Sequence, residues 1–115
     1  MRLTALLPPL LADPTIDDLV AAAGSRSRTD RTVVVAPGAR PAVLATMALG
    51  ASGIARATGA ADLAAPADAE EGTPLLVVTA TGRQAEETAA ALTCYLPSTD
   101  VAVFPAWETL PHERL

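Results

Sequence analysis

The chain has 115 residues, of which 50% are apolar and 3% aromatic, and a formal net charge of −5. This length suits one small domain, and the acidic balance argues against a free-standing nucleic-acid binder, because attraction to phosphates needs a basic surface. All eight basic residues are arginine, which excludes mechanisms that depend on a lysine, such as a P-loop lysine or a Schiff base.

The first predicted element is a helix that begins after Asp13. Asp13 suits the N-cap, Pro14 suits the first helical position, and Gly24 is placed where the helix should stop. Ile16 and Leu19 recur at helical spacing between these signals. The pattern therefore predicts an amphipathic helix over this stretch.

Three short apolar runs, at 32–36, 74–80 and 101–105, predict buried β-strands. Helices are predicted between them, one opening at Pro41 and one after the turn at 81–83. Strands that alternate with helices indicate a parallel sheet with right-handed crossovers. The predicted fold class is therefore α/β, a three-layer parallel sheet resembling an incomplete half of a P-loop NTPase.

We predict one unit over residues 1–115, the first part of a larger module. The helix that opens at Pro41 should fade between 50 and 59, and residues 60–73, rich in Ala, Pro and acidic side chains, are expected to form a flexible insertion. A three-stranded parallel sheet with two bare edges is a poor stand-alone structure. We therefore expect the chain to be truncated after residue 115.

The turn after the first predicted strand lies where nucleotide-binding proteins place a glycine-rich loop. A working loop has glycine, four residues, glycine, lysine and then Ser or Thr, but these fixed positions hold Ala36, Pro41, Ala42 and Val43. Pro41 also lacks the N–H that a phosphate would need, and Arg40 is the one cation nearby. We predict a degenerate nucleotide loop without cofactor binding, comprising Ala36, Gly38, Arg40, Pro41, Ala42 and Val43.

No catalytic residue and no metal site are predicted. Cys94 is the single cysteine and His112 the single histidine, whereas a zinc site needs about four clustered ligands. The apolar stretch near the N-terminus is too short and too proline-rich for a signal peptide, and no segment has the length of a membrane span. We expect a cytoplasmic protein with no membrane partner.

Trp107, the single tryptophan, follows the third predicted strand. One interpretation is that it packs over the end of the sheet as part of the core. The other is that it belongs to a binding or domain-docking surface, where aromatic residues are common.

Residues 75–115 resemble the amino-terminal region of the bacterial transcription-repair coupling factors, the Mfd family, in which this region is an excinuclease-B-like domain. FPAWETLP at 104–111 is the most specific segment. DPTIDDLVAAAG at 13–24 and VVVAPGARPAVLATMAL at 33–49 are also similar to that family's first helix and its degenerate nucleotide loop.

The resemblance implies a parent protein that is an ATP-dependent, helicase-like DNA translocase and hydrolase. Such proteins release stalled RNA polymerase and recruit nucleotide-excision repair, and the ATP and Mg belong to the parent, with no cofactor in this chain. The implied partners are the rest of the same polypeptide and, through other domains, RNA polymerase, the excinuclease A subunit and double-stranded DNA. The residues expected to make interdomain contacts are Trp107, Glu108, Leu110 and Pro111.

The alternative is a small stand-alone α/β domain that binds an anionic ligand at its strand ends. Open α/β sheets bind ligands outside the carboxyl ends of their strands. The residues placed there are Gly38, Arg40, Thr81, Gly82 and Arg83. In both cases the chain itself is expected to be non-catalytic.

Overall fold

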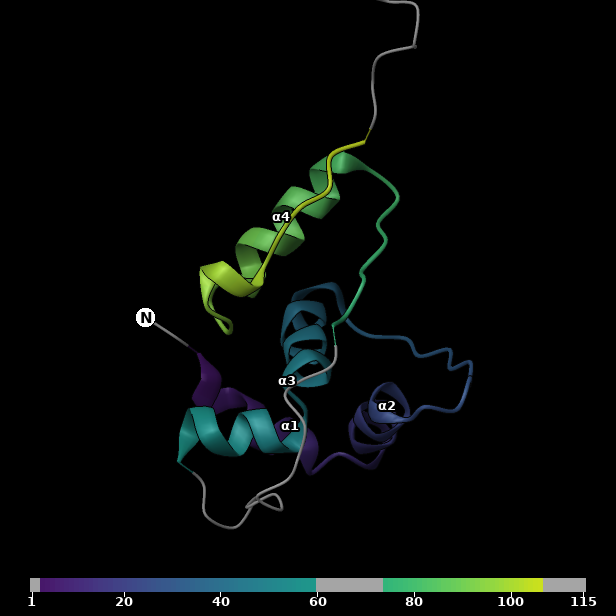
Figure 1. Cartoon of the computed structure of the whole chain (residues 1–115), viewed down its shortest axis with the longest axis vertical. Helices are drawn as coiled ribbons and strands as arrows, with labels where there is room; N and C mark the ends of the chain where they lie inside the picture. The colour runs from purple at the N-terminus through teal and green to yellow at the C-terminus, as the bar shows by residue number, and fades with distance from the viewer. Residues whose placement is uncertain (1–2, 60–73, 107–115) are drawn as a thin grey trace, which may run out of the picture.

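The computed structural model describes residues 3–59 and 74–106. Within these ranges the secondary structure is entirely helical, with four α-helices and three short 3-10 turns (Figure 1). The α-helices are α1 (Leu7–Leu11), α2 (Pro14–Gly24), α3 (Arg40–Thr58) and α4 (Gly82–Leu92), and the turns are Thr4–Leu6, Pro37–Ala39 and Ser98–Asp100.

The predicted start of α2 is confirmed by its capping bonds. The Oδ1 atom of Asp13 accepts hydrogen bonds from the backbone N–H groups of Thr15 at 2.8 Å and Ile16 at 3.4 Å. These two donors would otherwise lack partners in the first turn of the helix. The helix ends at Gly24, as expected.

The helix α4 also begins at the turn that the sequence indicates. The hydroxyl of Thr81 caps it by accepting a hydrogen bond from the backbone N–H of Gln84 at 3.2 Å. The helix ends at Leu92. The short helix α1 was not predicted, because its two prolines pointed to an interruption.

The helix α3 is the centre of the fold. It contacts α1, α2 and α4, so the other helices pack around it. Gly50 interrupts α3 with φ 63° and ψ 176°, and Gly59 ends the helix in the left-handed conformation at φ 68°. The expected fading of this helix between 50 and 59 thus takes the form of a kink and a glycine cap.

Two small apolar clusters make up the core, and α3 contributes to both. One cluster is Leu7, Ala45, Ile54 and Leu96, and the other is Ile16, Leu19 and Val43. The buried Thr46 is satisfied locally, since its hydroxyl donates to the carbonyl of Ala42 at 2.8 Å. The core is therefore built between helices and needs no sheet.

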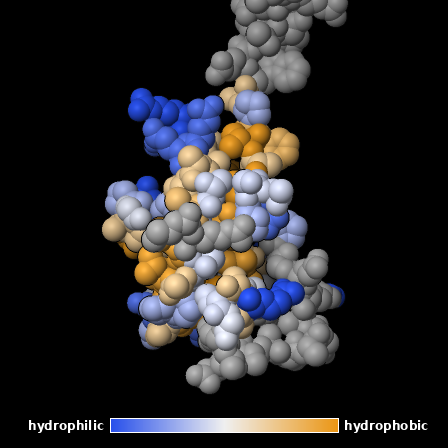
Figure 2. All heavy atoms as spheres, turned by 90° about the vertical axis from the view of Figure 1, so that its left-hand side faces the viewer, coloured by the Kyte–Doolittle hydropathy of each residue, from blue (hydrophilic) through white to orange (hydrophobic). Residues whose placement is uncertain are grey.

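The predicted α/β fold is wrong. No residue in the described ranges is in a β-strand, and within those ranges no backbone hydrogen bond joins two of the three apolar runs. The runs leave apolar side chains in solvent: Val34 is 97% exposed, Val78 85% and Phe104 86%. Apolar surface is correspondingly visible on the face drawn in Figure 2. There is therefore no parallel sheet, and no P-loop-NTPase-like half, in the described chain.

The physical reason for this error is that a strand exists only when its backbone groups pair with a neighbouring strand. Exposure alternates along the run at 75–78, from 38% at Leu75 and 37% at Val77 to 79% at Leu76. One side of this run thus faces the helices and the other faces solvent. A period of two predicts this alternation equally well for a strand and for an unpaired extended segment.

Two further expectations are not tested by the structure. The expected insertion at 60–73 lies outside the described residues. The expected truncation after residue 115 stays a prediction.

Candidate functional site

The segment predicted as a degenerate nucleotide loop forms a 3-10 turn followed by the first turn of α3. The backbone N–H of Ala39 donates to the carbonyl of Ala36 at 2.9 Å and closes the turn Pro37–Ala39. Gly38, at its centre, has no positive φ, and a Cβ added there would meet nothing within 4 Å. Neither a left-handed backbone nor crowding therefore requires glycine at this position.

The next four residues of this segment point in different directions. Ala42 packs against one core cluster and Val43 is buried in the other. Arg40 and Pro41 instead line a cavity. The segment thus divides between core packing and one possible binding surface.

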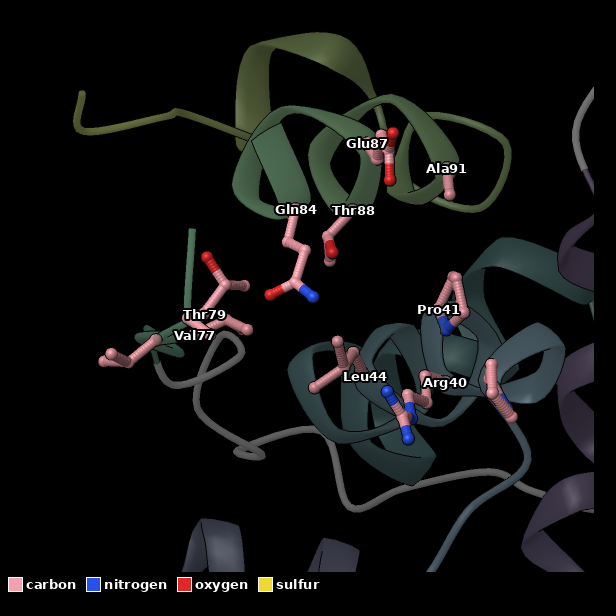
Figure 3. Close-up of a pocket in the computed structure, with 12 residues that line it drawn as sticks. Arg40, Pro41, Leu44, Val77, Thr79, Gln84, Glu87, Thr88 and Ala91 are labelled. Atoms are coloured by element: carbon pink, nitrogen blue, oxygen red, sulfur yellow. The ribbon is translucent and has the colours of Figure 1, made fainter. Parts of the chain in front are cut away.

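This cavity, which we call the α3–α4 cavity, has a volume of about 520 Å³ and is open to solvent (Figure 3). It lies between the first turns of α3, the extended run before α4, and α4 itself. Its lining residues are Pro37, Arg40, Pro41, Leu44, Val77, Val78, Thr79, Ala80, Gln84, Glu87, Thr88 and Ala91. Its volume falls within the range of pockets that hold small organic molecules.

Arg40 is the one basic residue among those that line the α3–α4 cavity. Its Nε–H donates to the carbonyl of Val35 at 3.3 Å, which holds the side chain against the preceding segment. No ion pair of Arg40 with a described carboxylate is found. Its terminal guanidinium nitrogens therefore remain available to a ligand.

The helix α4 supplies polar side chains from the opposite wall, where Gln84 extends toward α3 (Figure 3). The side-chain amide of Gln84 and the hydroxyl of Thr88 make no hydrogen bond to any described residue. The carboxylate of Glu87 also lines the cavity, but it accepts a 2.8 Å hydrogen bond from Nε of Arg83 in an exposed i,i+4 ion pair. Both donors on α4 are thus free, while the acidic group is already paired.

The anion site proposed from the sequence is only partly assembled. Arg40 lines the α3–α4 cavity, whereas Gly38, Thr81, Gly82 and Arg83 are absent from its lining. The hydroxyl of Thr81 caps α4, and Arg83 pairs with a residue on its own helix.

Gln84 and Thr88 were missed by sequence reasoning. Their spacing of four residues places them on one face of a helix, which was a usable signal. The sequence does not reveal, however, that this face is turned toward Arg40.

A second, smaller cavity of about 160 Å³ lies where the extended runs pass along α4, and Figure 1 shows the run at 101–106 turning back along this helix. Its lining is almost entirely apolar, and Phe104 and Leu92 contribute to it. This cavity could therefore hold an apolar group, but its lining contains no charged side chain. Trp107, Glu108, Leu110 and Pro111 lie outside the described residues.

The described residues contain neither a metal-binding cluster nor a membrane-spanning helix. No group of three or more His, Cys, Asp or Glu side chains in residues 3–59 and 74–106 is placed to hold a metal ion. In the same part of the chain, no helix combines the length and apolarity needed to cross a membrane.

Comparison with known proteins confirms the resemblance found in the sequence. Over 113 residues, 98% of this chain, it is 41% identical to proteins named transcription-repair-coupling factor from Mycobacterium bovis and Mycobacterium tuberculosis. The chain spans only 7% of the length of these two relatives. No protein-family model matches the chain, and no solved structure matches it. The chain is thus similar along nearly all its length to a small part of a transcription-repair-coupling factor.

Proposed function

We propose that this chain acts as a non-catalytic, amino-terminal part of a transcription-repair coupling factor. The whole protein would be an ATP-dependent DNA translocase that releases stalled RNA polymerase and recruits nucleotide-excision repair in the cytoplasm. The observation that carries the proposal is the 41% identity, which extends over 98% of the chain. RNA polymerase, the excinuclease A subunit, DNA, ATP and Mg would engage other domains of that protein.

The non-catalytic role is supported by the chemistry of the segment at 36–43. No lysine and no hydroxyl stand where a P-loop needs them. Ala42 and Val43, which take the positions of the lysine and the hydroxyl, pack into the helical core. A residue committed to the core cannot also reach a phosphate or a magnesium ion.

ATP turnover by the purified chain, with and without Mg, tests this non-catalytic role. We expect no Mg-dependent turnover above the buffer rate. The control is Arg40→Ala, which removes the cation nearest the former loop. Mg-dependent turnover by the wild-type chain above that of a mock preparation would contradict the proposal, and its loss in the variant would place it at this segment.

The mass of the native protein in its source cell tests the link to a longer polypeptide. An antibody raised against the peptide at 107–115 would detect it, with the free peptide as competitor to confirm specificity. We expect a band far above the 11.7 kDa of this chain. A single band at that mass would contradict the proposal and favour a stand-alone domain that binds an anionic ligand.

A further inference from the structure

We infer that the α3–α4 cavity binds a small organic molecule with one carboxylate and an apolar body. The site is defined by Arg40 on α3 and by Gln84 and Thr88 on α4, which line one cavity of about 520 Å³. This inference concerns side chains of the chain itself and holds whether or not the proposed function is correct.

The carboxylate follows from the hydrogen-bond donors that the cavity presents. The guanidinium of Arg40 has an unpaired end, and a guanidinium binds a carboxylate through two parallel N–H bonds. The amide of Gln84 and the hydroxyl of Thr88, neither bonded to a described residue, add donors from the facing helix. Hydrogen-bond donors thus line two walls of the cavity.

A single negative charge follows from the charges around the cavity. Arg40 is the one cation in the lining, and the carboxylate of Glu87 lies in the same lining. A second negative charge on the ligand would have no cation in the lining to pair with, since Arg83 is already paired with Glu87. The cavity therefore suits a monocarboxylate better than a phosphate that carries two charges.

The apolar body follows from the remaining walls. Leu44, Val77 and Pro41 line the cavity together with the methyl group of Ala91. An alkyl chain placed against these side chains would be removed from water, which stabilises binding in proportion to the apolar area buried. Because Arg40 itself is exposed to solvent, its charge is screened, and we expect millimolar affinity.

Titration of the 115-residue chain with octanoate, followed by the backbone amide signals in NMR spectra, tests this inference. We expect saturable shifts at residues 40–44 and 84–91, and no comparable shifts with octanamide, which has the same length without the charge. Equal binding of octanamide would overturn the inference. Inorganic phosphate that bound as tightly as octanoate would overturn it too, because the apolar walls would then contribute nothing.

Variants locate the binding within the cavity. Arg40→Gln should weaken octanoate binding about fivefold, as expected for an ion pair exposed to solvent, and Thr88→Val, which keeps the side-chain shape, should weaken it by a smaller factor. The matched control is Arg56→Gln, which removes an exposed arginine of α3 that is absent from the cavity lining. An Arg40→Gln protein that gives well-dispersed spectra and binds like the wild type would overturn the inference. An equal loss of octanoate affinity in Arg56→Gln would also overturn the inference, because the affinity would then depend only on the net charge of the chain.

Discussion

The backbone N–H of Leu3 donates a 2.7 Å hydrogen bond to the carbonyl of Cys94 and ties the N-terminal stretch to the turn that follows α4. Two buried leucines reinforce this junction, because Leu7 from α1 and Leu96 from beyond α4 belong to one apolar cluster. The N-terminal stretch and the turn after α4 thus meet at the core, and α4 is held to the other helices through the residues just after it.

Leu96→Ala should destabilise the fold through this junction. Leu96 is 7% exposed, and truncation of a buried leucine costs about 2–5 kcal/mol of the free energy of unfolding. Urea unfolding followed by circular dichroism measures the change. Leu76→Ala is the control: Leu76 is 79% exposed, so its truncation should change the free energy by less than about 0.5 kcal/mol. Equal effects of the two variants would show that Leu96 is not a core residue.

Gly50→Ala should destabilise the chain through the backbone alone. A Cβ at this position would meet nothing within 4 Å, but φ 63° with ψ 176° is a conformation that essentially only glycine adopts. We expect a loss of about 1–3 kcal/mol in the free energy of unfolding. Gly24→Ala serves as control, because Gly24 has equal space and no positive φ. If Gly50→Ala left stability unchanged or raised it, the kink in α3 would be refuted.

Asp13→Ala should lower stability by about 1 kcal/mol, because two N–H groups of α2 would lose their acceptor. Asp13→Asn should retain most of the wild-type stability, since an amide oxygen can accept the same bonds. Thermal unfolding of the three proteins checks this order. Equal loss in both variants would mean that the carboxylate acts through its charge and not as a cap.

Val78→Thr should leave stability within about 0.5 kcal/mol of the wild type, because Val78 is 85% exposed and the substitution keeps the branched shape. It should also reduce the fluorescence of a dye that binds apolar surface, since it removes part of the exposed apolar face. If Val78→Thr instead cost several kcal/mol, the side chain would have to be buried, contrary to the structure.

The local signals in the sequence were sufficient for α2, α3 and α4 but missed α1. The cap at Asp13 and the turn at 81–83 marked where α2 and α4 begin, because a capping side chain acts within a few residues of its own position. The three apolar runs predicted as buried strands form no strand in the structure. Pairing depends on which segments meet in space, and local composition carries no information about that.

The candidate site shows the same division between local and tertiary information. Arg40 stood out in the sequence as the cation of a loop without lysine, and it does line the α3–α4 cavity. Gln84 and Thr88 line the same cavity as Arg40 because α4 packs against α3. The sequence of α4 alone does not indicate this packing. Thr81, which was proposed as an anion ligand, is used instead as a helix cap.

The most direct test of the proposed function is an exchange of segments in the transcription-repair-coupling factor of Mycobacterium tuberculosis. The stretch aligned to this chain would be replaced by residues 1–115, and the repair rate of the transcribed strand would be measured after ultraviolet damage. A variant that lacks the stretch and the unaltered protein serve as the two controls. The proposal predicts repair close to that of the unaltered protein. Repair no better than in the variant that lacks the stretch, with the exchanged protein present at normal levels, would contradict it.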